Sequence, residues 1–214
     1  MPPDVFESTE LRWFRDGAPP FDASRLFSRD RKAGRKVELP GAAQPLMDAR
    51  PDLYFVSADP GLGVKVRGGG VRPRLELKAR GASRPWASGR GAGVVETWRK
   101  WSWEGPSAPE DAAGGSWARV EKRRLLWTLE WARGALRFVP PGTRVAHGAG
   151  IEVTALDALG RTAWTFGVEA FGIGPEPDAL VDRAAELLVA ATGVRPDARE
   201  SFGYPEWLLG LTRG

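Results

Sequence analysis

The chain has 214 residues, of which 42% are hydrophobic, and this is enough to bury one sizeable core, so we expect a single domain over residues 1–214. The absence of cysteine excludes disulfide frameworks, thiolate metal sites and cysteine nucleophiles. A formal charge of +4, from 31 basic and 27 acidic residues, does not demand a long nucleic-acid footprint. Neither a signal-peptide pattern nor an apolar run of about eighteen residues occurs, so we expect a cytoplasmic protein without membrane contact.

Strand-like segments recur along the chain, separated by segments rich in Gly, Pro and Asp. We predict strands at 11–14, 53–56, 64–67, 74–80, 94–103, 119–131, 151–156 and 163–171. The gaps at 81–93 and 105–115 are predicted to be loops. Sheets of so many antiparallel strands either leave edges open or close into a barrel, which removes the edges.

One helix is predicted, over residues 177–193. Asp178 is the candidate N-cap, apolar residues follow at helical spacing, and Gly193 stands where a C-cap glycine would. The tail YPEWLLGL that follows is expected to dock Trp207 and its leucines on the body of the protein.

Charged residues gather on one face of several predicted strands, because side chains two positions apart share a face. The charged faces carry Lys65 and Arg67, then Arg74, Glu76, Lys78 and Arg80, then Lys122 and Arg124, and finally Glu152 and Glu169. One interpretation is a solvated sheet face on which opposite charges pair across strands. The other folds these faces inward to line a polar channel.

The string WRKWSWE, residues 98–104, offers a rival function. Alternating aromatic and basic residues can stack bases and bind phosphates, so a single-stranded nucleic-acid binder is a second hypothesis. Packing is the more common fate of tryptophans at strand spacing, such as Trp101 and Trp103. The lone His147 and the absence of a G-x-S-x-G motif give little support to serine hydrolysis or a histidine metal site.

The order of these segments resembles the CYTH, or triphosphate tunnel metalloenzyme, superfamily. STELR (8–12) stands where that family has an E-x-E-x-K strand, YFVSADPGLGVKVR (54–67) and LELK (75–78) resemble its first basic strands, and VEKRR (120–124) resembles a later one. IEVTALDALGRTAWTFGVEAFG (151–172) resembles its closing hairpin, and a helix follows. The resemblance spans about residues 8–192. It implies an α+β, mainly antiparallel β fold: a closed or nearly closed tunnel-type β-barrel with a C-terminal helix.

The resemblance also implies a site for a triphosphate or another polyanionic phosphate ligand. It implies catalytic roles for Glu10, Glu76, Glu152 and Glu169, phosphate binding by Arg12, Lys65, Arg67, Lys78, Lys122 and Arg124, and Mg²⁺ or Mn²⁺ binding by Glu10, Glu152 and Glu169. Such a site would direct metal-assisted attack of water on a phosphoryl group.

Two family carboxylates are replaced in this chain, because Ser8 and Gly167 occupy their positions. Whether the chain is a metal-dependent triphosphatase or a non-catalytic binding module of the same fold therefore remains open at the level of sequence.

Overall fold

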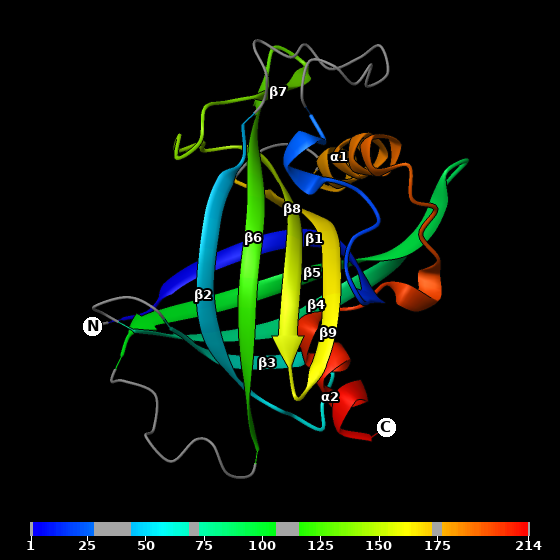
Figure 1. Ribbon diagram of the computed structural model, residues 1–214. Coiled ribbons are helices and arrows are strands. Elements are labelled where there is room, and N and C mark those ends of the chain that lie inside the picture. Colours follow the sequence, from blue (N-terminus) through cyan, green and yellow to red (C-terminus); the bar gives the residue numbers. More distant parts are fainter. Residues whose placement is uncertain (1, 28–43, 69–72, 106–115, 173–176, 214) are drawn as a thin grey trace.

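The computed structural model describes residues 2–27, 44–68, 73–105, 116–172 and 177–213 (Figure 1). Its strands are β1 (Asp4–Asp16), β2 (Leu46–Phe55), β3 (Leu62–Arg67), β4 (Arg74–Ser88), β5 (Gly91–Glu104), β6 (Trp117–Ala132), β7 (Ala135–Phe138), β8 (Gly148–Ala158) and β9 (Arg161–Phe171). Its helices are the short 3-10 helices η1 (Ala23–Arg25) and η2 (Ala198–Glu200) and the α-helices α1 (Pro177–Thr192) and α2 (Tyr204–Arg213).

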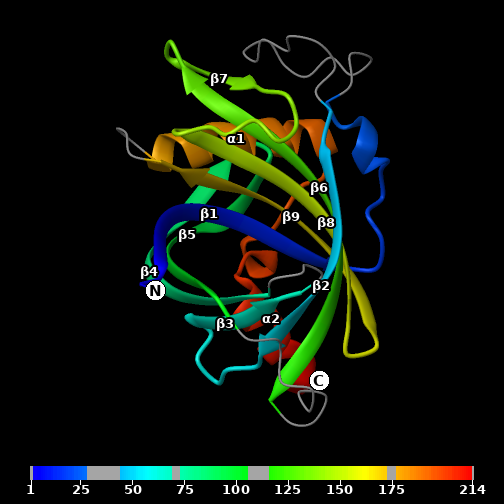
Figure 2. The same ribbon diagram turned by 90° about the vertical axis from the view of Figure 1, so that its left-hand side faces the viewer.

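Eight strands close into an antiparallel barrel in the order β2-β3-β4-β5-β1-β9-β8-β6. Closure comes from the pairing of β2 with β6, which runs from Leu46 opposite Leu126 to Phe55 opposite Trp117. The short β7 adds to the far end of β6, beyond β2. Figures 1 and 2 show β2, β6, β8 and β9 crossing in front of the flatter layer formed by β1, β3, β4 and β5. The predicted closed barrel is confirmed.

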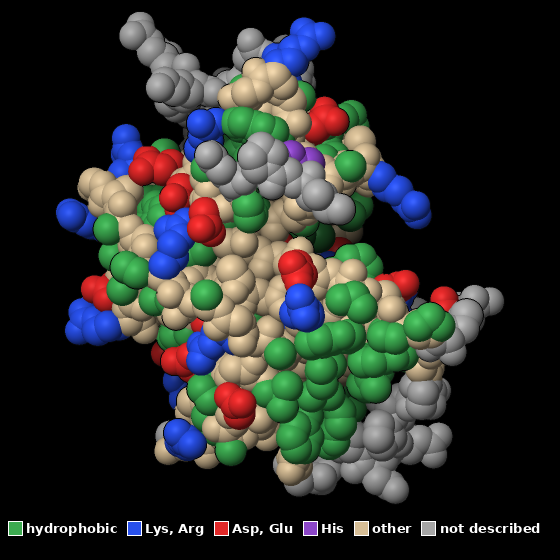
Figure 3. Space-filling view, turned by 180° about the vertical axis from the view of Figure 1, so that it is seen from behind, with side chains coloured by type: hydrophobic (Ala, Val, Ile, Leu, Met, Phe, Trp, Pro, Cys, Tyr) green, Lys and Arg blue, Asp and Glu red, His purple; other side chains and the backbone are tan. Residues whose placement is uncertain are grey.

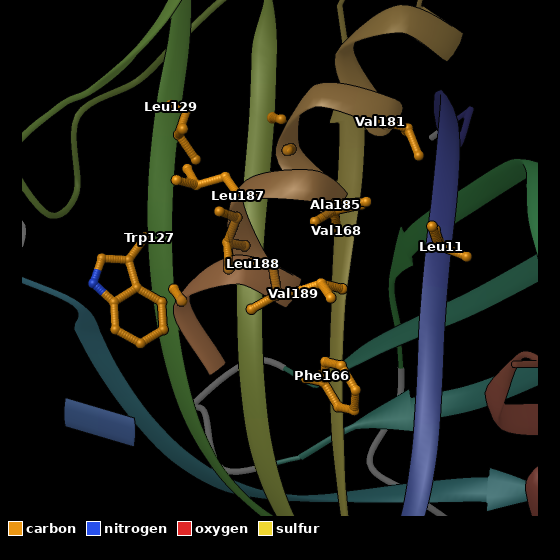
Figure 4. Close-up of a cluster of buried hydrophobic side chains, with 14 of the residues drawn as sticks. Leu11, Trp127, Leu129, Phe166, Val168, Val181, Ala185, Leu187, Leu188 and Val189 are labelled. Atoms are coloured by element: carbon orange, nitrogen blue, oxygen red, sulfur yellow. The ribbon is translucent and has the colours of Figure 1, made fainter. Parts of the chain in front are cut away.

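The main apolar core lies outside the barrel wall, between the wall and α1. Alternation turns Leu11 of β1, Phe166 and Val168 of β9, and Trp127 of β6 outward, and Leu188 of α1 packs among them (Figure 4). All five are buried. Because the outer faces of these strands carry the apolar residues, the inner faces are free to carry charge.

The second helical element closes one end of the barrel. Trp207 and Leu208 of α2 are buried against Phe14 of β1, Tyr54 of β2 and Leu156 of β8, all of which point into the barrel. We call the apolar group around α2 the end cluster; its buried members are Phe14, Tyr54, Ala118, Val120, Leu156, Ala158, Ala163, Trp207 and Leu208. The prediction that the tail docks its Trp207 and leucines is confirmed, and the tail is helical.

The predicted helix is confirmed, with a correction at its start. α1 begins at Pro177, so Asp178 lies in its first turn and is not the N-cap. Gly193 follows the last residue with a φ of +67° and donates its N–H to Val189 O, as a C-cap glycine does. None of the described helices is long and apolar enough to cross a membrane.

The prediction of a loop over 81–93 is wrong. β4 continues to Ser88 and pairs with β5 from Ser83 opposite Glu96 onward, after a register shift that follows Arg80. Trp86 explains the extension, because its ring packs edge-on against Trp13 at 5.6 Å and so fixes the hairpin on the outer core. The other predicted loop, 105–115, lies outside the described residues except for Gly105. β7 was not predicted.

The outer face of the flatter layer carries an apolar patch. Cross-strand pairing sets Leu77 of β4 opposite Trp101 of β5, and Leu75 opposite Trp103. Figure 3, seen from behind, shows hydrophobic side chains gathered on this side of the barrel. The four residues are half-buried, and packing as the role of these tryptophans stays a prediction. Lys100, from the same Trp-rich string, lies on the opposite, inner face.

Candidate functional site

The interior of the barrel holds a polar cavity of about 210 Å³. It is lined by all ten residues that the sequence assigned to the site, Glu10, Arg12, Lys65, Arg67, Glu76, Lys78, Lys122, Arg124, Glu152 and Glu169, together with Arg50, Tyr54, Gly63, Glu96, Trp98, Lys100, Gly203, Tyr204 and Pro205. The charged faces of the strands therefore point into the barrel. The alternative of a solvated sheet face does not describe these residues.

The inner faces of β1 and β6 change from charged to apolar towards the end cluster. On β1 the side chains that point into the barrel are Glu10, Arg12 and then Phe14. On β6 the charged Lys122 points into the barrel, and the next inward residue towards the end cluster is the apolar Val120. The apolar positions belong to the end cluster, and the charged ones line the cavity. The cavity is thus bounded at one end by α2 and its contacts.

Glu152 is held between two arginines. Arg12 donates to Glu152 Oε1 at 2.9 Å, Arg124 donates to Oε2 at 3.3 Å, and the Thr154 hydroxyl donates to Oε1 at 2.7 Å. Burial by itself raises the pKa of Glu152, but the charges of Arg12 and Arg124 outweigh it and leave this pKa well below its usual range. Glu152 is therefore a permanently ionised partner of two predicted phosphate ligands.

Glu10 and Glu169 face each other directly on the paired strands β1 and β9. Glu10 accepts hydrogen bonds from Lys78 and, at 2.8 Å, from the Ser8 hydroxyl. Burial acts to raise the pKa of Glu10, but the positive charges of Lys78 and Arg12 together lower it by more. The pKa of Glu10 therefore lies below its usual value. Burial and the negative charge of Glu10 raise the pKa of Glu169. Within the described residues Glu169 has no hydrogen bond or ion pair.

Glu76 lies between the basic residues of β3. Its carboxylate is 3.0 Å from Lys65 Nζ and 3.6 Å from a guanidinium nitrogen of Arg67. Burial acts to raise its pKa, but Lys65 and Lys100 have the larger combined effect and lower the pKa of Glu76 to about 2. Glu76 thus acts as an internal counter-ion for the cations that it neighbours.

Strand β2 supplies a group of charged residues that the sequence interpretation missed. Asp52 is completely buried and pairs with Arg50 at 2.9 Å, Lys65 at 3.3 Å and Lys122 at 3.4 Å. Asp48 pairs with Arg50 and with Arg124. The signal was present in the sequence, because DARPD places charges at alternate positions, although a proline inside a strand is uncommon.

Lys122 occupies the deep end of the cavity, next to the end cluster. Its side chain is 4% exposed, its Nζ donates to the Tyr54 hydroxyl at 2.6 Å, and it lies 3.7 Å from the centre of the Tyr204 ring. Burial, followed by the charge of Lys65, holds the pKa of Lys122 well below its usual value. Its contacts with Asp52 and the two tyrosines fix its position.

Lys100 is a cavity cation that the sequence interpretation did not assign, because WRKWSWE was considered as a nucleic-acid-binding string and not as part of the phosphate site. It faces Lys78 across β4 and β5. Within the described residues no carboxylate lies within ion-pair distance of it. Burial lowers the pKa of Lys100, and the positive charges of Lys78 and Lys65 act in the same direction. An added anion can neutralise it without displacing a partner.

The two departures from the family pattern have different surroundings. The Ser8 hydroxyl takes part in the site by donating to Glu10. At Gly167 a Cβ atom would lie 2.6 Å from the backbone oxygen of Leu11, so the neighbouring strand leaves no room for a side chain. A glutamate at position 167 is incompatible with this close approach of β1 and β9.

The described residues do not form a metal site as they stand. Among them, no group of three or more Asp, Glu, His or Cys side chains is placed to hold an ion. Of the three carboxylates assigned to Mg²⁺ or Mn²⁺, Glu10 is bound by Lys78, and Glu152 by two arginines. Metal binding by Glu10, Glu152 and Glu169 stays a prediction, and so do their catalytic roles.

Fold and site together define a class: a closed antiparallel β-barrel with a charged interior cavity. No family model matches the sequence, and no curated protein matches it. Similar solved structures include the capping enzyme triphosphatase of Mimivirus, with a TM-score of 0.45 and 8% identity over 86% of this chain and 89% of that one.

A second similar structure is the Pct1 RNA triphosphatase of S. pombe, with a TM-score of 0.38 and 11% identity over 88% of this chain and 77% of that one. Its complex with the Spt5 CTD also matches, with a TM-score of 0.36 and 11% identity over 85% of this chain and 76% of that one. These values describe a distant likeness in shape.

Proposed function

We propose that this protein binds a triphosphate, or a related polyphosphate, in the polar cavity of the barrel. The observation that carries the proposal is the charge of the lining: eight Lys or Arg side chains and five Glu side chains face one enclosed space. Asp48 and Asp52, which pair with lining cations, bring the carboxylates to seven, so positive groups remain in excess. Enclosed positive charge is costly unless an anion neutralises it.

The chemistry of the lining fits phosphate. Arginine binds phosphate oxygens with a planar pair of N–H groups, while lysine supplies a compact charge, and both kinds line the cavity. The carboxylates Glu76 and Glu152 keep the cations in place when no ligand is bound. A bound phosphate chain would share or replace these contacts.

Hydrolysis of the ligand with Mg²⁺ or Mn²⁺ is a further prediction, and the ion pairs of Glu10 and Glu152 favour binding without turnover. An anion that takes over Lys78 would release Glu10, beside the unpaired Glu169, and these are the two carboxylates that a metal ion could then use. Turnover therefore has to be measured in the presence of the ligand and the metal together.

The test is a set of thermal melts with inorganic tripolyphosphate, ATP and a short single-stranded oligonucleotide, each with and without Mg²⁺. Wild type is compared with Lys65→Ala and Lys78→Ala. We expect tripolyphosphate to raise the melting temperature of wild type and to do so much less in both variants. Phosphate release in the same samples separates an enzyme from a binding module. A shift with the oligonucleotide alone would favour the nucleic-acid hypothesis and contradict the proposal.

A further inference from the structure

Among the described residues, the lining of the polar cavity becomes more exposed with distance from the end cluster. Towards the end cluster the lining is nearly buried: the side chain of Lys122 is 4% exposed and that of Arg12 is 11% exposed. At the opposite end, which we call the mouth, the side chain of Arg67 is 39% exposed. Figures 1 and 2 show α2 at the closed end of the barrel. The mouth is therefore the side of the cavity on which a ligand would have room for a group other than phosphate.

An exposed aromatic residue lies beside the cavity lining, on the part of β1 that is away from the end cluster. Phe6 lies near the start of β1, on the same inner face as Ser8 and Glu10, and it is 49% exposed. Its direct cross-strand neighbour is Lys100 of the cavity lining. The Lys100 Nζ lies 4.9 Å from the centre of the Phe6 ring.

Phe6 belongs to neither apolar cluster of the protein. It is absent from the outer core around α1 and from the end cluster around α2. Lys100 covers it on one side, and half of its surface is open to solvent. A flat ring in this position can stack a second flat ring, and base–aromatic stacking tolerates any base because every base has a π-face.

We propose that Phe6 is a specificity-determining residue, which stacks a nucleobase-type group attached to the phosphate chain. The phosphates occupy the cavity, and Lys100 lies between the stacked group and the phosphates. This inference rests on the proposed function. It distinguishes a nucleoside triphosphate, or a longer molecule with a triphosphate end, from an inorganic polyphosphate. An inorganic chain has no group that Phe6 could stack.

The test is isothermal titration with inorganic tripolyphosphate and with ATP, both with EDTA present, on the full chain. We expect Phe6→Ala to weaken ATP binding roughly ten-fold and tripolyphosphate binding less than about two-fold. Phe6→Tyr, which keeps the ring, should retain ATP binding. Val5→Ala is the matched control, because Val5 is the adjacent residue, is 54% exposed and faces the other side of β1; it should change neither affinity.

The outcomes separate the two proposals. Binding of tripolyphosphate but not of ATP to wild type would overturn the role of Phe6 and leave the proposed function standing. An equal loss of both ligands in Phe6→Ala, or no loss of ATP, would also overturn it. If wild type bound neither ligand, the proposed function would fail, and this inference with it. Thermal melts of each variant show whether it is folded.

Discussion

The ion pair between Glu76 and the β3 lysine predicts a specific pH dependence of stability. The pKa of Glu76 is about 2 in the folded protein, compared with its usual 4.5. A difference of about 2.5, at about 1.4 kcal/mol for each pKa unit, corresponds to about 3 kcal/mol of stability. Because the folded pKa is the lower one, this contribution is complete above about pH 4.5 and is lost as the pH falls through about 2.

The assay is urea unfolding followed by tryptophan fluorescence, between pH 6 and pH 2, on wild type and Glu76→Gln. We expect the difference in unfolding free energy between the two proteins to shrink by about 3 kcal/mol over this range, because only wild type can lose the charge. Glu186→Gln, which removes an exposed carboxylate from α1, is the matched control. The same pH dependence in wild type and Glu76→Gln would refute the reasoning.

Three further predictions follow from the site. Glu169→Gln should raise the affinity for tripolyphosphate in EDTA by roughly ten-fold, because it removes from the cavity lining a carboxylate that would repel the anion. Titration calorimetry would show no gain if the carboxylate is remote from the ligand. Trp207→Ala should lower the free energy of unfolding in urea by about 3–5 kcal/mol, because the Trp207 ring stacks on Phe14 at 5.2 Å in the end cluster. A loss below about 1 kcal/mol would argue against a packed end. Gly167→Glu should destabilise the protein and fail to create Mg²⁺ binding, because the Cβ atom of the new side chain would meet the backbone oxygen of Leu11. Tighter Mg²⁺ binding by calorimetry would contradict this account.

The charged faces could be predicted from sequence because they depend only on alternation along a strand. Lys65 and Arg67 had to share a face whatever the exact strand ends were. What alternation alone cannot decide is whether a face points to solvent or into a barrel. The closing pair of β2 with β6 decides it, and that pair joins residues about seventy positions apart in the sequence.

Several site residues could not be predicted because tertiary contacts overrule local signals. Asp52 follows a proline that normally ends or weakens a strand, and only the pairing with β3 and β6 holds it in the barrel. Lys100 shares its inner face with Trp98, whereas Trp101 and Trp103 of the same string take the outer face. The docking of Trp207 could be predicted, but the closure of one end of the barrel by α2 could not, because it depends on the contacts of α2 with β1, β2 and β8.

The most direct test of the central claim is titration of wild type and Lys100→Ala with inorganic tripolyphosphate. Lys100 is chosen because, among the described residues, its removal breaks no ion pair, so a loss of binding is not a consequence of an uncompensated buried carboxylate. Arg119→Ala removes an equal charge from the exposed outer face and is the control. The account predicts measurable binding to wild type, a loss of roughly ten-fold in Lys100→Ala and little change in Arg119→Ala. Equal effects of the two substitutions, or no binding to wild type, would contradict an anion site inside the barrel.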